Sequence, residues 1–480
     1  MPPAGVEAMN RLHFGFLLAL LLVAGCSLSP EHIRPASPVP DVWALPDRGN
    51  GAAARPGRWQ SFFVAPALAD LIALALENNR DLRVAVQRVE VVRSQYRIQR
   101  AELFPHLDGG AHSSRTKTPA DLSYTGKTII ANSFSASLSA GWELDLWGRV
   151  RNLDTAALES WLATDEARRA VALNLIAEIA NTWLVGRELD ERIALAARTI
   201  DSRRDSARIV RRRYEVGASP RLDLTLAETL LGQADSALTV LEQQRERTQN
   251  ALSVLVGAPV GAEIVALSSV EAAVVRDLPP GLPSTLLEDR PDIRGAENLL
   301  RAAEADIGAA RAAFFPRIAL TGEYGTASAA LDGLFLGGSR IWTLAANLSV
   351  PLFDGGRLLG ALDAAKAQRS MAVAEYERTV QTAFRDVADA LAARRWLGQQ
   401  VAAQQRTLDA LTERARLSRL RYLHGASTYL DVLDAERDLF ATEQALVETR
   451  RARLSSEVNL YAALGGGDDE TDRRPPHDQD

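Results

Sequence analysis

The feature that most limits what this chain can fold into is an internal repeat. Several short motifs recur, three of them at an offset of 208 residues and one at 211. They are 213–219 with 421–427 (Arg-Tyr-Glu-Val-Gly-Ala-Ser and Arg-Tyr-Leu-His-Gly-Ala-Ser), Leu222-Asp223 with Leu430-Asp431, Gly148-Arg149 with Gly356-Arg357, and Phe104-Pro105 with Phe315-Pro316. The sequence therefore predicts two copies of one unit, at 62–257 and 280–465, joined by a linker at 258–279.

Each copy is predicted to contain the same order of elements. A helix ends at the Phe-Pro pair, because proline stops a helix, and two strands, a very long helix, a Gly-Ala-Ser turn and a returning helix follow. The helices are expected at 66–103, 149–214 and 221–256 in the first copy, and at 283–314, 357–423 and 428–464 in the second. At a rise of ~1.5 Å per residue, the longest helices would span on the order of 100 Å.

The strands are predicted from a period of two. Between residues 133 and 142, serine or glycine alternates with phenylalanine, alanine, leucine and tryptophan, and 342–350 alternates in the same way. Residues 106–115 and 317–326 alternate more weakly. About ten residues is the length of a tilted membrane strand. The alternative is a soluble hairpin with one buried face.

Four membrane strands per chain would require an oligomer. An open sheet edge in lipid leaves backbone groups unpaired, at a cost of several kcal/mol each. Two chains would supply eight strands, whose interior side chains fill, whereas three would supply twelve, which can enclose water. The expected fold is therefore an α+β membrane protein, with a long helical barrel and four strands per chain in a trimeric β-barrel. Alanine-rich helices also allow an alternative, a lipid-anchored coiled-coil spacer that does not conduct.

The N-terminus carries the pattern of an export signal. Arg11 precedes an apolar run at 14–24, and Val-Ala-Gly-Cys at 23–26 resembles the bacterial lipobox. Cys26 is the only cysteine of the chain and is the expected site of lipidation. We therefore expect a lipoprotein signal peptide at 1–25 and a lipid anchor with an extended linker at 26–61. The polar residues at 466–480 are expected to form a disordered tail.

Together these features resemble the TolC-like outer-membrane efflux channels, most closely the lipoproteins of the NodT/OprM type. The motifs that carry the resemblance are Leu-Ala-Asp-Leu at 68–71, Asn-Asn-Arg-Asp-Leu at 78–82, Glu-Leu-Asp-Leu-Trp-Gly-Arg at 143–149, Arg-Pro-Asp-Ile-Arg at 290–294, Phe-Pro at 315–316, Pro-Leu-Phe-Asp-Gly-Gly-Arg at 351–357, and 422–436. The resemblance covers nearly the whole chain after the signal. It implies a homotrimer in the outer membrane with a large periplasmic part. It also implies docking to a periplasmic adaptor (membrane fusion) protein and an inner-membrane pump of the RND type.

Two carboxylates are the candidate functional residues. Asp431 and Asp434 are three residues apart and would share one face of a helix. The resemblance implies that they line a constriction at the closed periplasmic tip of the channel. The alternative is structural, since Ser427 or Thr428 can cap this helix and an acid in its first turn favours the dipole. Asp223 matches Asp431 in the repeat, so that position can be structural in both copies, whereas Asp434 matches a leucine.

Three further residues are candidates at the same tip. Tyr422, matched by Tyr214, resembles a family residue that helps to hold the tip closed, and simple packing is the alternative. The resemblance implies that the turns at Gly217 and Gly425 contact the adaptor. Their alternative role is that of glycines that end a helix.

The sequence lacks the patterns expected of an enzyme. Its six histidines have no metal-ligand spacing, and no phosphate-binding loop is present, so a partner must supply the energy. We expect no catalytic residue, cofactor or metal, and a net charge of -6 argues against nucleic acid as a partner. The leading function is a passive duct for small molecules, and a type I secretion duct for polypeptides is the alternative.

Overall fold

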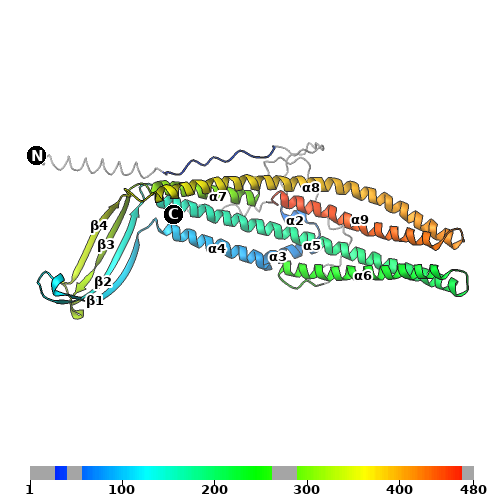
Figure 1. Ribbon diagram of the computed structural model, residues 1–480, viewed down its shortest axis with the longest axis horizontal. Helices are drawn as coiled ribbons and strands as arrows, with labels where there is room; N and C mark the ends of the chain where they lie inside the picture. The colour runs from blue at the N-terminus through cyan, green and yellow to red at the C-terminus, as the bar shows by residue number, and fades with distance from the viewer. Residues whose placement is uncertain (1–26, 41–56, 262–288, 468–480) are drawn as a thin grey trace. The chain divides into compact units, whose positions relative to one another are not determined.

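The computed structural model describes residues 27–40, 57–261 and 289–467 (Figure 1). The expected signal peptide at 1–25, Cys26, and most of the expected linker at 258–279 and of the expected tail at 466–480 lie outside the described residues. The chain divides into two compact units. The sheet unit comprises Met1–Ala36, Arg88–Asp165 and Gly295–Glu377, and the hairpin unit comprises Ser37–Gln87, Glu166–Arg294 and Arg378–Asp480.

The sheet unit contains one antiparallel sheet with the strand order β1-β2-β3-β4. The strands are β1 (His106–Thr118), β2 (Ile129–Leu144), β3 (Arg317–Ser328) and β4 (Arg340–Ser349). All four predicted strands are therefore confirmed, and three of the four extend further than the alternating pattern reached. Strands β2 and β3 pair with each other, so the two halves of the sequence form one continuous sheet.

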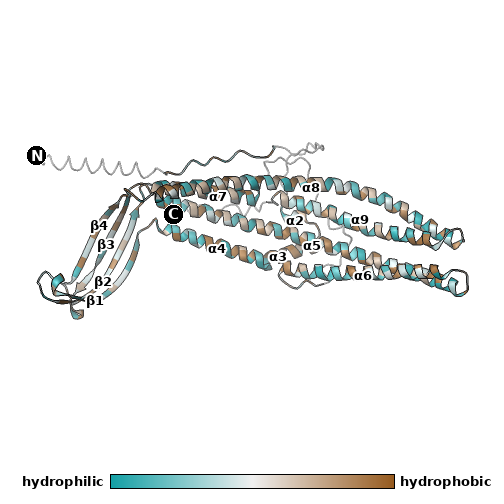
Figure 2. Ribbon diagram, in the orientation of Figure 1, coloured by the Kyte–Doolittle hydropathy of each residue, from teal (hydrophilic) through white to brown (hydrophobic). Residues whose placement is uncertain are grey.

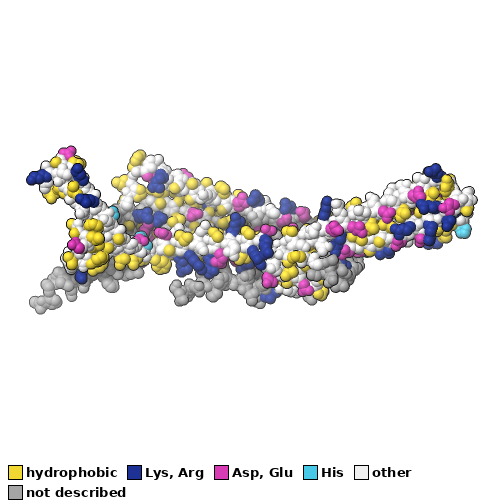
Figure 3. Space-filling model, turned by 90° about the horizontal axis from the view of Figure 1, so that it is seen from below, with side chains coloured by type: hydrophobic (Ala, Val, Ile, Leu, Met, Phe, Trp, Pro, Cys, Tyr) yellow, Lys and Arg dark blue, Asp and Glu magenta, His cyan; other side chains and the backbone are white. Residues whose placement is uncertain are grey.

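The strand register places the apolar residues of all four strands on the same face of the sheet. Leu138 lies opposite Gly109 on one side and Tyr324 on the other, and Tyr324 in turn lies opposite Trp342. Residues directly opposite each other share a face of an antiparallel sheet. One face is consequently apolar and exposed, with Leu138 at 54%, Tyr324 at 59% and Trp342 at 75% exposure. The apolar side chains that gather on the sheet are visible in Figure 3, and the alternation along each strand in Figure 2.

The opposite face of the sheet is polar. Ser139 lies between Asp108 of β1 and Glu323 of β3, and Glu323 lies opposite Thr343 of β4. At the base of the sheet, the Glu143 carboxylate accepts two hydrogen bonds from Arg149, each of 2.9 Å, and also pairs with Arg317. The sheet thus has one face suited to lipid and one suited to water.

Residues 27–36 form no helix or strand, and within the sheet unit they contact the helix that follows β2 and the helix that precedes β3. Ser27 Oγ donates a hydrogen bond of 2.9 Å to Asn152 Oδ1, in the first turn of α5. His32 Nδ1 lies 2.8 Å from Glu304 Oε2, and Arg34 pairs with Glu297 at 2.8 Å. Burial raises the pKa of Glu297, but the hydrogen bonds and charges of Arg34, Arg301 and His32 outweigh it and hold that pKa below its usual value. The segment after Cys26 is therefore attached where the strands pass into helices.

The helices follow the predicted order. The two longest are α5 (Arg149–Glu215) and α8 (Arg357–Leu423), of 67 residues each, and α6 (Arg221–Val256) and α9 (Tyr429–Ala463) return from the turns. The predicted bounds of these four helices are confirmed to within one residue. In the described part of the chain, no helix is both long enough and apolar enough to cross a membrane.

The first predicted helix, at 66–103, is two helices in the structure. α3 (Pro66–Asn78) and α4 (Arg80–Ala101) are separated by Asn79. Asn79 is buried, its Oδ1 accepts a hydrogen bond from the Leu82 amide, and its Nδ2 donates to the Leu255 carbonyl at 2.7 Å. The asparagine thus caps α4 and holds this junction against α6. In the second half, α7 (Pro291–Ala312) begins at a proline, which suits a first helical position.

Ion pairs hold the helices of the hairpin unit together. Glu188 of α5 is 4% exposed and pairs with Arg192 of its own helix at 2.9 Å and with Arg451 of α9 at 2.7 Å. Asp190 of α5 pairs with Arg245 of α6 at 2.6 Å. These ion pairs therefore tie α5 to both α6 and α9, and breaking the buried pair of Glu188 would leave an uncompensated charge.

Candidate functional site at the hairpin turns

The two helical turns have the same backbone geometry. Gly217 and Gly425 have φ values of 72° and 73°, in the left-handed region that favours glycine. The backbone amide of the residue after each glycine donates a hydrogen bond to the carbonyl five residues earlier. Ala218 donates to Arg213 at 2.7 Å, and Ala426 donates to Arg421 at 2.8 Å. These are the hydrogen bonds of a Schellman motif. Both glycines therefore end a helix, and both are exposed and accessible to a partner.

A small apolar cluster packs next to the turns. It combines residues of α5 and α6 with residues of the second hairpin: Ala207, Val210, Ala227, Tyr422, Tyr429 and Val432. The Tyr422 and Tyr429 rings meet edge to face, with centroids 5.1 Å apart. The cluster therefore joins the two hairpins through side chains that are almost entirely buried.

Tyr422 links the two hairpins next to their turns. Its hydroxyl donates a hydrogen bond of 3.3 Å to Asp223 Oδ2 at the start of α6, and the Arg213 guanidinium lies 4.9 Å from its ring centroid. The same Asp223 oxygen accepts a hydrogen bond of 3.0 Å from Ser219. Burial and the Asp223 charge raise the pKa of the Tyr422 phenol above its usual value. The phenol therefore stays protonated and able to donate.

Asp223 does more than the repeat suggested. Its match with Asp431 predicts that the position can be structural in both copies, and in the structure Asp223 also accepts the hydroxyl of Tyr422 across 199 positions of sequence. The residues Asp223, Arg213 and Tyr429 were missed as site residues. The repeat could not identify them, since the hydrogen bond joins positions of the two copies that are not equivalent.

Asp431 and Asp434 have separate local partners. Asp431 Oδ2 accepts a hydrogen bond of 3.1 Å from the Thr428 amide, so the predicted alternative, a capping interaction at the start of α9, is present. Asp434 lies 3.5 Å from Arg437 in the next turn, and its side chain is 39% exposed. Asp431 is exposed. Neither carboxylate contacts the Tyr422 hydrogen bond, so the structure separates the acidic pair from the link between hairpins.

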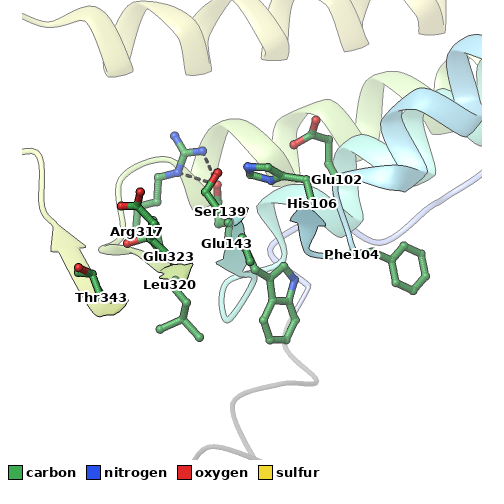
Figure 4. A pocket seen from close by; sticks show the side chains of 15 residues that line it. Glu102, Phe104, His106, Ser139, Glu143, Arg317, Leu320, Glu323 and Thr343 are labelled. Atoms are coloured by element: carbon green, nitrogen blue, oxygen red, sulfur yellow. Dashed lines mark hydrogen bonds and ion pairs between the residues drawn. The ribbon is translucent and has the colours of Figure 1, made fainter. Parts of the chain in front are cut away.

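A second region of interest is a hollow at the base of the sheet (Figure 4). It has a volume of about 440 Å³ and is lined mainly by side chains of the polar face, including His106, Ser139, Glu323 and Thr343. Glu143 already has two arginine partners there. Among the described residues, no group of three or more histidine, cysteine, aspartate or glutamate side chains is arranged to hold a metal ion. The hollow is therefore part of the polar face of the sheet.

Taken together, an amphipathic sheet with an exposed apolar face and two long helical hairpins define a subunit of an outer-membrane channel. A family model described as outer membrane efflux protein matches residues 71–258 and 282–466, and the chain belongs to this family. The protein is thus an outer-membrane efflux protein with a large periplasmic part, and it is not an enzyme.

Relatives and solved structures agree with this assignment. The solvent efflux pump outer membrane protein SrpC of Pseudomonas putida is 43% identical over 458 residues, covering 94% of this chain and 97% of SrpC. The outer membrane protein OprJ of Pseudomonas aeruginosa is 42% identical, covering 96% and 98%. The fold matches a membrane protein from Pseudomonas aeruginosa with a TM-score of 0.87 at 41% identity, covering 92% of this chain and 98% of that one. It also matches the channel CusC with a TM-score of 0.85 at 38% identity, covering 92% and 100%.

Proposed function

We propose that three copies of this chain form a channel through the outer membrane that serves as the exit duct of an efflux pump. The main support is the structure of the sheet. It exposes an apolar face, and among the described strands its two outer strands, β1 and β4, each have a neighbour on one side only. Backbone groups at such edges must be paired in lipid. Twelve strands from three copies close the sheet and leave room for water inside.

The duct is proposed to carry small molecules. The relatives are named as outer membrane proteins of solvent, toluene and antibiotic efflux pumps, which favours this cargo over polypeptides. The channel itself is passive, because the sequence holds no phosphate-binding loop. It therefore works with a periplasmic adaptor and an inner-membrane pump of the RND type. The exposed turns at Gly217 and Gly425 are the proposed contacts with the adaptor.

Lipidation of Cys26 is part of the same proposal. Ser27, the residue that follows it, is hydrogen-bonded to Asn152, eight residues after β2 ends at Leu144. A lipid on Cys26 would therefore start close to the base of the sheet, where membrane strands end. The anchor and the sheet would then engage the same membrane, which supports the lipobox interpretation.

Conductance and subunit number test the proposed channel. The purified full-length protein should form water-filled pores in planar lipid bilayers, and native mass spectrometry in detergent should give the mass of three chains. The protein after heat unfolding, added at the same concentration, is the control. Monomers or dimers, or bilayers without stable conductance, would contradict the proposal and favour a spacer that does not conduct.

The acidic residues of α9 are proposed to form a cation-selective constriction. A trimer would gather six carboxylates from Asp431 and Asp434, and their repulsion favours cations in a narrow pore. Asp434→Ala should lower the cation selectivity of single channels with little change in stability. Asp431→Ala should do the same and also cost roughly 0.3–1 kcal/mol, because it removes the acid from the first turn of α9.

Asp438→Ala is the matched control for this prediction. Asp438 lies one turn beyond Asp434 on α9 and pairs with Arg414 of α8 at 2.8 Å. Because the Asp438 charge is already balanced by Arg414 of the neighbouring helix, its removal should change the cation selectivity little. If the Asp431→Ala, Asp434→Ala double variant keeps wild-type selectivity, the constriction lies elsewhere.

A further inference from the structure

A groove of about 540 Å³ lies in the hairpin unit between the helices α5, α8 and α9, which are labelled in Figure 1. One part of its lining is apolar and includes Leu420, Leu439 and Phe440. The charged part of the lining consists of four arginines and two glutamates: Arg198, Arg203, Arg416, Arg419, Glu436 and Glu443. Grooves of this size hold small molecules, and this lining suits a ligand with a charged head and an apolar chain.

Arg203 of α5 places a buried positive charge in this groove. The residue is 4% exposed, its guanidinium lies 5.0 Å from the Phe440 ring centroid, and it donates a hydrogen bond of 2.9 Å to the Leu230 carbonyl. Among the described residues, its Nε has no hydrogen-bond partner. Burial lowers the pKa of the guanidinium, and the attraction of Glu436 does not offset this. Because an arginine still stays protonated at neutral pH, its charge is buried with incomplete compensation.

The internal repeat shows that an ion pair present in the first hairpin is missing from this groove. In the first hairpin, Arg211 of α5 pairs with Glu228 of α6 at 2.6 Å. The equivalent residues of the second hairpin, 208 positions later, are Arg419 of α8 and Glu436 of α9. In the described part of the chain these two form no ion pair, and Arg419 instead donates a hydrogen bond of 3.1 Å to Ser206 of α5. Arg419 therefore retains donors that no carboxylate uses.

The groove carries one more positive charge than negative charges. Arg416 is already neutralised, because it donates two hydrogen bonds of 2.7 Å to Glu413. The three other arginines of the lining then stand against two carboxylates, Glu436 and Glu443, which leaves one positive charge in excess. Burial raises the pKa of Glu436, and the nearby arginine charges do not offset this, so Glu436 compensates the arginines only in part. One bound monoanion would balance the groove.

We infer that this groove binds an alkyl carboxylate, a monoanion with an apolar chain, through Arg203 of α5 and Arg419 of α8. Charge-assisted hydrogen bonds from the two guanidinium groups would hold the carboxylate, and the chain would lie along the apolar part of the lining. Helices α5 and α8 belong to different hairpins, so the bound ligand would tie the hairpins together and favour the closed channel. This effect on opening rests on the proposed channel, whereas the binding itself does not.

Binding of octanoate tests the groove in the full-length protein. Isothermal titration calorimetry of the protein in lipid nanodiscs, with empty nanodiscs subtracted, should show one octanoate bound per chain. Octanol has the chain without the charge, and acetate has the charge without the chain. Each should bind at least about tenfold more weakly, because each lacks one of the two interactions.

Three variants locate the bound ligand. Arg419→Gln should weaken octanoate binding about tenfold, because a charge-assisted hydrogen bond is lost. Glu436→Gln should strengthen it several-fold, since a carboxylate that competes for the same arginines is removed. Arg416→Gln is the matched control, because Glu413 already occupies this guanidinium, and the affinity should stay within about twofold. A general loss of structure would not shift the affinity in opposite directions in the first two variants.

Single-channel recording separates the groove from the channel. Octanoate should lower the open fraction of wild-type channels and leave that of Arg419→Gln unchanged. Octanol or acetate binding as tightly as octanoate, or octanoate binding unchanged by Arg419→Gln, would overturn the inference. A wild type that forms conducting trimers but binds no octanoate would overturn the groove alone. A wild type that binds octanoate but neither forms trimers nor conducts would overturn the channel and support the binding site.

Discussion

Tyr422→Phe should raise the fraction of time that the channel is open. The variant keeps the ring in its packed position against Tyr429 and Arg213 and removes only the hydrogen bond to Asp223. A hydrogen bond of this kind contributes about 1 kcal/mol. Three such links in a trimer would contribute about 3 kcal/mol, which corresponds to a change on the order of 100-fold in the balance between closed and open tips.

Single-channel recording of the open fraction is the measurement. Asp223→Ala should have at least the same effect, because it removes the acceptor shared by Tyr422 and Ser219. The matched control is Tyr214→Phe, which changes the equivalent tyrosine of the first copy. The Tyr214 side chain is 40% exposed, and removal of its hydroxyl should leave the open fraction of the channel unchanged. An open fraction for Tyr422→Phe equal to that of the wild type would mean that the hydrogen bond to Asp223 does not hold the tip closed.

The elements of the fold could be predicted from the sequence because each has a local signal. The alternation of apolar and small polar residues predicted the strands. The Phe-Pro pairs predicted the ends of the first helices, and the Gly-Ala-Ser turns predicted the ends of the longest ones. The break at Asn79 has no such signal. Asparagine there acts through a carbonyl of Leu255, which is 176 residues away in sequence and brought close only by folding.

The candidate site was predictable in part for the same reason. The interaction of Asp431 with Thr428 is local, three residues apart, and the sequence suggested it as a capping interaction. The hydrogen bond between Tyr422 and Asp223 joins two hairpins and depends on their packing. A repeat identifies equivalent positions in the two copies, whereas this bond connects positions that are not equivalent. Contacts of that kind require the three-dimensional arrangement.

Gly257→Ala should destabilise the protein far more than Gly425→Ala, although the two glycines have nearly the same backbone conformation. Both have φ close to 74°, and any residue with a Cβ pays roughly 1–2 kcal/mol there. At Gly425, no atom other than its chain neighbours would lie within 4 Å of the added methyl group among the described residues. At Gly257, the methyl group would meet the Asn78 carbonyl carbon at 2.8 Å and its oxygen even closer.

The extra cost at Gly257 comes from backbone that cannot move freely. Asn78 ends α3, and Asn79 is fixed by its hydrogen bonds to Leu255 and Leu82. Moving this junction would break the cap of α4 and disturb the contact with α6, so we expect a total loss above about 3 kcal/mol. Thermal unfolding in detergent measures it: Gly425→Ala should lower the midpoint by a few degrees, whereas Gly257→Ala should lower it much further or fail to assemble. Equal losses in the two variants would show that left-handed strain alone sets the cost, and that the junction at Asn78 yields to the methyl group.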